Sequence, residues 1–217
     1  MSLLRKLFPL GAVTFLALAG IAAQTLALSY PLSSTAIRDA YFIGNRNDEQ
    51  TAEFLSQYIR WFPAPKSGPY IREIGIDTPF SEVVKRTQGR PNFYAPDAVQ
   101  EFQKQRAVAL RVHVDIFLTP SYSPVPPASA PEYDQWVPDF WNDFKVTLVQ
   151  DGVETPAESI RGGPIYSYGY DPIPLITGAR IELTYNPEKI DPELAQVVVL
   201  TPDGQTIEAS FNLAKLR

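Results

Sequence analysis

Strict alternation of apolar side chains dominates the second half of the sequence and restricts the folds open to it. From residue 108 to residue 118 every second side chain is apolar, which is the pattern of a β-strand with one buried face. The same alternation, or a short continuous apolar run, returns in residues 144–148, 165–170, 181–185, 197–200 and 207–213. Asp151-Gly152 and Asp203-Gly204 supply the residues of tight turns between such segments.

This spacing predicts about seven strands in roughly 110 residues, the size of an immunoglobulin-like β-sandwich. A C2-like or jelly-roll sandwich gives a similar pattern, so the exact topology stays open. We expect a mainly β chain with a small α-containing N-terminal part. Residues 28–105 form a helical or mixed region in this interpretation, and residues 106–217 form the sandwich. Residues 161–164, Arg-Gly-Gly-Pro, are interpreted as a turn.

Helical signals are confined to the first of these regions. Helices are expected in residues 34–42, 47–62, 79–84 and 97–102, with one strand in residues 70–76. Asn47 followed by Gln50 resembles a polar capping box at the start of the second helix. Thr78-Pro79 begins the third, because proline in a first helical turn loses no hydrogen bond.

Residues 1–27 have the organisation of a secretory signal peptide. Arg5 and Lys6 precede an apolar stretch over residues 7–23, and Thr-Leu-Ala at residues 25–27 supplies small residues for cleavage. An uncleaved membrane anchor in residues 7–28 is the alternative, since the stretch is just long enough to span a bilayer. Both interpretations predict an exported protein, periplasmic or extracellular, which contacts the membrane only if this segment is retained.

Composition excludes several classes of chemistry. The chain has no cysteine and one histidine, which rules out disulfides and cysteine nucleophiles and leaves little for a metal cluster. No metal and no cofactor are therefore expected. Without residues 1–27 the chain carries 17 basic and 24 acidic side chains, and residues 106–217 contain eight of the former and fifteen of the latter. Such an acidic module repels phosphate backbones, so nucleic acid is excluded as a partner.

The single histidine, His113, lies between Arg111 and Asp115 on the polar face of the alternating segment. Asp115 would orient the imidazole if His113 were a catalytic base. Any solvated strand face shows such neighbours, however, and the sequence contains no Gly-x-Ser-x-Gly motif for a partner nucleophile. We expect an exposed, non-catalytic histidine.

A long connection at residues 119–143 interrupts the strands and is the most informative place to look for function. It contains six prolines, five aromatic and four acidic residues, and no lysine or arginine. The candidate binding residues are Tyr133, Trp136, Phe140 and Trp141. Their rings can stack on sugars or peptides. Alternatively, they fold back and cap one end of the sandwich.

Two functions from different classes follow from these features. The first is an exported, non-enzymatic cell-envelope protein with a binding or structural role, recognising a protein or glycan or taking part in envelope assembly. The second is a saccharide hydrolase, for which paired carboxylates are required. Asp134, Asp139 and Asp143 in the same connection are the candidate catalytic residues of that alternative.

Overall fold

The computed structural model describes residues 31–90, 92–104, 109–119, 139–167 and 175–217 and is mainly β. The predicted signal peptide, residues 1–27, lies outside the described residues. The strands are β1 (Ile59–Trp61), β2 (Pro69–Asp77), β3 (Leu110–Leu118), β4 (Lys145–Gln150), β5 (Val153–Thr155), β6 (Ser159–Ser167), β7 (Leu175–Tyr185), β8 (Leu194–Leu200) and β9 (Thr206–Asn212). The helices are α1 (Ser34–Arg46), α2 (Glu49–Ser56), α3 (Pro79–Thr87) and α4 (Ala95–Lys104), with 3-10 turns η3 (Phe140–Asp143), η4 (Pro187–Lys189) and η5 (Leu213–Lys215).

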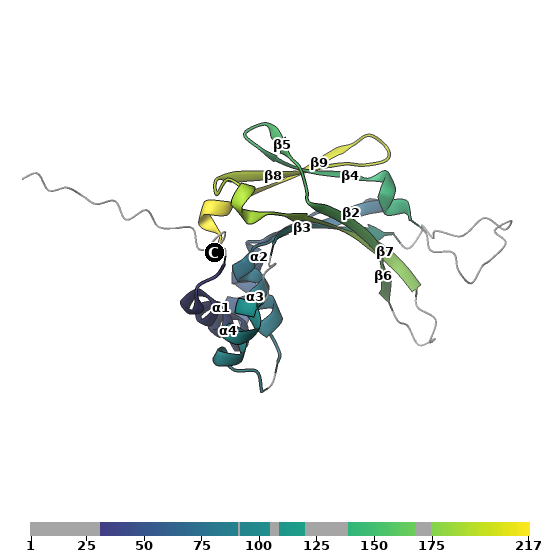
Figure 1. Cartoon of the computed structure of the whole chain (residues 1–217). Coiled ribbons are helices and arrows are strands. Elements are labelled where there is room, and N and C mark those ends of the chain that lie inside the picture. The colour runs from purple at the N-terminus through teal and green to yellow at the C-terminus, as the bar shows by residue number, and fades with distance from the viewer. Residues whose placement is uncertain (1–30, 91, 105–108, 120–138, 168–174) are drawn as a thin grey trace, which may run out of the picture.

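These strands form two antiparallel sheets that pack face to face (Figure 1). Sheet A has the strand order β1-β2-β3-β7-β6, and sheet B has the order β5-β4-β8-β9. Every neighbouring pair is antiparallel. The prediction of a mainly β chain with a small helical part is confirmed.

The core between the sheets explains the alternation in the sequence. Val112, Val114 and Ile116 of β3 are completely buried, and so are Leu148 of β4 and Val197 of β8 in the same cluster. Because successive residues of a strand point to opposite faces, a period of two places one set of side chains between the layers.

Strand pairing crosses the division predicted after residue 105. β2 lies in the N-terminal region, yet it pairs with β3 from Pro69 opposite Leu118 to Asp77 opposite Arg111. The short strand β1 extends the same sheet beyond β2. Sheet A therefore draws strands from both predicted regions.

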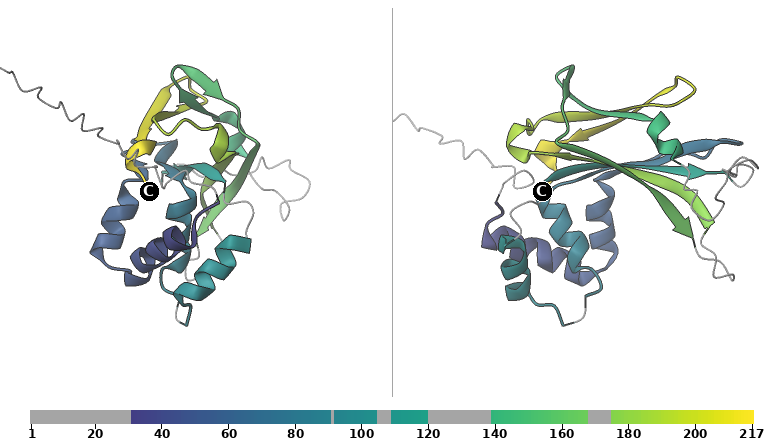
Figure 2. Two further views of the ribbon diagram at one scale, coloured as in Figure 1. Left: turned by 60° about the vertical axis from the view of Figure 1, so that its left-hand side comes forward. Right: turned by 45° about the vertical axis from the view of Figure 1, so that its right-hand side comes forward.

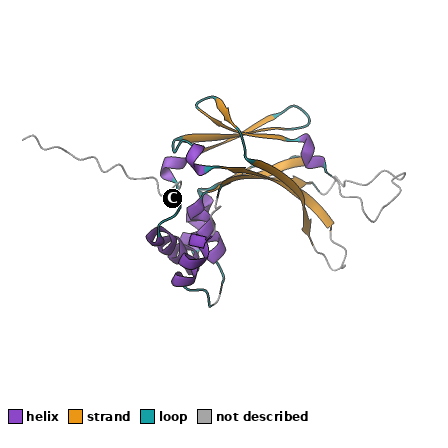
Figure 3. Cartoon of the chain, in the orientation of Figure 1, coloured by secondary structure: helices purple, strands orange, loops and turns teal. Residues whose placement is uncertain are grey.

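The four helices gather on the outer side of sheet A, away from sheet B (Figures 2 and 3). Their buried residues form a second apolar cluster. Thr78 begins α3 as predicted, with its hydroxyl accepting from the Ser81 N–H and Pro79 in the first turn. At Gly44 of α1, a Cβ atom would lie 2.3 Å from the Val84 carbonyl oxygen of α3, so glycine permits this close helix contact. None of the described helices is long and apolar enough to cross a membrane.

The helix predicted over residues 47–62 is wrong in its start and its end. Asn47 adopts a left-handed conformation, with φ 48°, and terminates α1. Asp48 caps α2 instead, accepting a hydrogen bond from the Thr51 N–H. The chain leaves the helix after Ser56, and residues 59–61 form β1 because they pair with β2. Tertiary strand pairing overrides the local helical spacing here.

The turn predicted at residues 161–164 is also wrong. These residues lie inside β6, where Gly162 is opposite Ile181 and Pro164 is opposite Ala179 of β7. β6 is an edge strand, which tolerates proline because its outer N–H groups have no ladder partner.

Candidate functional site

A pocket of about 520 Å³ opens at one end of the sandwich. Three segments distant in the sequence line it: residues 62–71 at the entry to β2, Phe144 just before β4, and residues 201–207 around the β8–β9 turn. Its volume lies in the range of small-molecule sites, about 300–1,000 Å³. The pocket is the candidate binding site of the described part of the chain.

The pocket lining combines aromatic rings with prolines. Phe62, Tyr70 and Phe144 supply the rings. The prolines in the lining are Pro63, Pro65, Pro69 and Pro202. A proline has no backbone N–H, so these positions offer only carbonyl acceptors to a ligand.

The β8–β9 turn forms the polar rim of the pocket. Asp203 accepts hydrogen bonds from the Thr201 hydroxyl and, at 2.7 Å, from the Gln205 side-chain amide. The Thr201 hydroxyl oxygen also accepts from the Gln205 backbone N–H at 3.0 Å, and Gly204 takes the left-handed conformation that the turn requires, with φ 82°. The hydrogen bond from the Thr201 hydroxyl lowers the pKa of the Asp203 carboxyl despite the opposing effect of desolvation. Asp203 is therefore an ionised carboxylate at neutral pH.

The predicted binding connection ends at this pocket. Tyr133, Asp134 and Trp136 lie outside the described residues. Phe140 and Trp141 belong to η3, which leads directly into the pocket residue Phe144.

The two described aromatic residues of that connection pack on the sandwich. Phe140 and Trp141 are half-buried against the core, with ring centroids 5.7 Å apart. The Trp141 indole lies over Gly162 of β6, where an added Cβ would be 2.2 Å from Cδ1. This contact agrees with the capping interpretation for Trp141, and the role of both residues in binding stays a prediction.

The Gly162 contact gives a matched pair of variants. Gly162→Ala is expected to destabilise the protein by about 1–2 kcal/mol, because the new methyl group displaces the indole. Gly163→Ala, at the next position, meets no atom within 4 Å and is expected to change stability by about 0.5 kcal/mol or less. Urea unfolding measures both. Equal effects of the two variants, or an undiminished cost of Gly162→Ala in a Trp141→Ala background, would contradict the packing contact.

Asp139 and Asp143, the other candidates for hydrolysis, are exposed at the two ends of η3. Asp139 accepts a hydrogen bond from the Asn142 side-chain amide at 3.2 Å. Neither residue lines the pocket. Their catalytic role stays a prediction.

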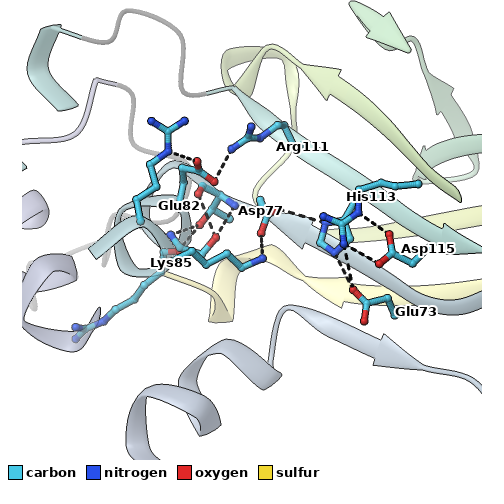
Figure 4. A network of polar contacts seen from close by, with 12 residues as sticks. Glu73, Asp77, Glu82, Lys85, Arg111, His113 and Asp115 are labelled. Carbon is cyan, nitrogen blue, oxygen red and sulfur yellow. Dashed lines mark hydrogen bonds and ion pairs between the residues drawn. The ribbon is translucent and has the colours of Figure 1, made fainter. Parts of the chain in front are cut away.

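A second concentration of polar side chains lies on the outer face of sheet A, centred on His113 (Figure 4). The His113 Nδ1 atom is 3.2 Å from Asp77 Oδ2, and Nε2 is 3.5 Å from Glu73 Oε1. A neutral imidazole has one N–H donor, whereas the imidazolium has two and satisfies both carboxylates. The geometry thus favours the charged form.

The pKa shifts of these three residues have identifiable causes. Burial disfavours the imidazolium, but hydrogen bonds to Asp77 and Glu73 outweigh it and raise the pKa of His113. The hydrogen bond from His113 lowers the pKa of Glu73 against the effect of burial. Burial opposes ionisation of Asp77 more strongly, yet His113 and Lys85 together hold its pKa far below the usual range.

Further ion pairs join this face to helix α3. Lys85 of α3 pairs with Asp77, and Glu82 of α3 pairs with Arg111 of β3. On the neighbouring strand, Arg180 binds Asp115 through two hydrogen bonds of 2.5 and 2.7 Å. We use the name charged network for the residues joined by these contacts: Glu73, Asp77, Glu82, Lys85, Arg111, His113, Asp115 and Arg180. Among the described residues, every buried side-chain nitrogen and oxygen has a hydrogen-bond partner.

The expectation that His113 is exposed is wrong, since only 4% of its surface is accessible. His113 is shielded from solvent because Glu73 and Asp77 of β2 lie against its two ring nitrogens. The sequence held one signal of this arrangement: Glu73, Gly75 and Asp77 alternate with the apolar residues of the predicted strand at residues 70–76. Sequence reasoning missed these acids as partners of His113. That His113 is non-catalytic stays a prediction.

No group of three or more histidine, aspartate or glutamate residues in the described ranges is placed to hold a metal ion. Comparison of the chain with protein-family models, with curated proteins and with solved structures finds no match.

Proposed function

We propose that this chain is an exported, non-enzymatic cell-envelope protein that binds a protein or glycan ligand at the end of an immunoglobulin-like sandwich. The observation that carries the proposal is the pocket of about 520 Å³ at which residues 62–71, Phe144 and the β8–β9 turn converge. Its lining of rings and prolines is typical of recognition sites. The charged network lies on another face, and its carboxylates are engaged in ion pairs.

The strand order supports an immunoglobulin-like topology. If β2 to β9 are lettered A, B, C, C′, D, E, F and G, sheet A reads A-B-E-D with β1 added beside A, and sheet B reads C′-C-F-G. These are the two sheets of immunoglobulin-like domains. In variable domains of that fold the B–C and F–G loops lie at the ligand-binding end. The corresponding connections here are the one between β3 and β4, whose last residue, Phe144, lines the pocket, and the β8–β9 turn, which also lines it.

Export is supported by the organisation of residues 1–27 alone. A chain without cysteine has no disulfide to stabilise it in an oxidising compartment, and the extensive core between the sheets stabilises it instead. The proposal includes a structural role, in which the protein takes part in envelope assembly without binding a small ligand.

A pocket-blocking variant tests the proposal. The secreted protein is titrated with soluble peptidoglycan fragments and with short peptides containing proline and aromatic residues, and binding is followed by saturation-transfer NMR and calorimetry. Ser67→Trp adds a large ring at the pocket lining, and Glu154→Trp on the exposed strand β5 is the matched control. A ligand of the wild type is expected to bind the control equally and Ser67→Trp at least about tenfold more weakly, a loss of about 1.4 kcal/mol.

Two outcomes would contradict the proposal. Binding that Ser67→Trp leaves unchanged would move the site away from the pocket. Hydrolysis of a glycan by the wild type, lost in Asp139→Asn or Asp143→Asn with folding intact, would establish the hydrolase instead.

A further inference from the structure

Several hydrogen-bond donors around the pocket are engaged within the protein. The Thr201 hydroxyl and the Gln205 amide both donate to Asp203. The Gly68 N–H donates to the Thr119 hydroxyl at 2.9 Å, and the Phe62 N–H to the Arg72 carbonyl at 2.9 Å. The four prolines of the lining have no N–H at all. The Asp203 carboxylate and the carbonyl groups of the prolines remain as acceptors for a ligand that brings its own donors.

The charge of the pocket lining also favours a ligand that brings hydrogen-bond donors. Asp203 is its charged residue, and no lysine, arginine or histidine is among the residues that line the pocket. Lys66 and Lys145 are neighbours of lining residues in the sequence but do not contribute to the lining themselves. An anionic ligand would meet a carboxylate and no cationic side chain of the lining, which disfavours it.

The aromatic rings of the pocket suit a cation with an apolar body. Phe62, Tyr70 and Phe144 bring three rings to one small volume, and ring faces attract ammonium and guanidinium groups. The chain makes such contacts elsewhere, with the Arg72 guanidinium 4.5 Å from the Phe117 ring centroid and that of Arg60 4.7 Å from Phe211.

We propose that the pocket binds an organic cation with an apolar body, its charge facing Asp203 and its apolar part lying against the rings and prolines. The inference rests on the proposed function, because it names the ligand class of the same pocket. The chemistry is shared by a free amine and by a lysine or arginine side chain of a polypeptide.

Three matched probes test the charge preference: 2-phenylethylammonium, 2-phenylethanol and 3-phenylpropionate, titrated into the secreted protein and followed by NMR. The ammonium is expected to bind most tightly and the carboxylate most weakly. Asp203→Asn is expected to weaken the ammonium about fivefold, the upper end for an exposed ion pair, and to leave the alcohol unchanged. Asp151→Asn, in the equivalent Asp-Gly turn of the β4–β5 hairpin, is the control and is expected to change neither.

A second variant keeps the test decisive if Asp203→Asn disturbs its turn. Tyr70→Leu keeps an apolar side chain and removes one ring, so it is expected to weaken the ammonium more than the alcohol. Capped tripeptides with a central lysine or arginine distinguish the two sources: peptide binding assigns the site to a polypeptide, and binding of the amine alone assigns it to a free amine.

Equal or tighter binding of the alcohol or the carboxylate would overturn the cation preference and leave the pocket as a binding site. Failure of all these probes would overturn the inference as well. In that case the proposed function is tested separately, by the effect of Ser67→Trp on the binding of peptidoglycan fragments and peptides.

Discussion

His113→Gln is expected to lower the free energy of unfolding at pH 6 by about 3 kcal/mol. Removal of one member of a buried ion pair leaves its partners uncompensated, which costs about 3–5 kcal/mol. His113 is 4% exposed and faces Glu73 and Asp77. Lys85 and Arg180 still lie near these carboxylates in the variant, so we expect the lower end of that range. Urea unfolding followed by circular dichroism measures the loss.

The same variant is expected to remove a characteristic pH dependence. The pKa of His113 is raised in the folded protein, so its contribution is complete below the unfolded pKa of about 6.5 and is lost as the pH rises through the folded value. The pKa values of Glu73 and Asp77 are lowered, so their contribution is present above about pH 4 and is lost as the pH falls through the folded values. The wild type should therefore be most stable at about pH 5–6 and lose stability toward pH 9.

Lys145→Gln is the control, because it removes one exposed cation from β4 of sheet B, whereas the charged network lies on sheet A and α3. The free energy of unfolding of the wild type and of this control should fall as the pH rises from 5 to 9. That of His113→Gln should change much less over the same range. Parallel pH profiles of His113→Gln and the wild type would show that the imidazolium does not stabilise the fold.

Gly75→Ala is expected to lower the free energy of unfolding by about 3 kcal/mol, because the new methyl group displaces the His113 ring. Gly75 lies directly opposite His113 on β2. A Cβ atom there would lie 2.3 Å from both Cε1 and Nε2 of the ring, so the imidazole has to leave its place between the two carboxylates. The cost combines overpacking, typically about 1–3 kcal/mol, with the loss of the paired geometry. Urea unfolding of the variant measures it.

A double-mutant cycle with His113→Ala separates this clash from a general intolerance of side chains at position 75. The added methyl group meets only the imidazole among its three nearest atoms, so Gly75→Ala should cost little once the ring is gone. The expected coupling between the two substitutions is about 2–3 kcal/mol, in the range for residues in contact. Additive costs would show that the ring does not occupy the space over Gly75.

Local patterns were sufficient to predict much of the fold. The alternation over residues 108–118 became β3, and the Asp-Gly pairs became the turns of the β4–β5 and β8–β9 hairpins. Thr78-Pro79 begins α3 as predicted. In each case the determining interactions lie within a few residues of one another, because strand alternation, turn conformation and helix capping are local properties.

Local patterns failed where a distant segment decided the outcome. Residues 59–61 continue a helical spacing in the sequence, but they pair with β2. Gly162 and Gly163 suggest a turn, yet they pair with β7, and Gly162 leaves room for Trp141.

The candidate site shows the same division. The sequence indicated residues 119–143 as the place to look, and Phe144, at the end of that connection, lines the pocket. Residues 63–69 and the β8–β9 turn also line the pocket. Nothing in the sequence indicated that they belong to a binding site, because only the packing of the two sheets brings them together.

The sequence by itself determined that this chain builds strands with one apolar face, turns at Asp-Gly pairs and a few capped helices. The tertiary structure decided what covers the other face of β3. A period of two separates the side chains of a strand into two sets, but it carries no information about the element that packs on the second set. For that reason the pattern predicts an exposed His113, although Glu73 and Asp77 lie against it and only 4% of its surface is accessible.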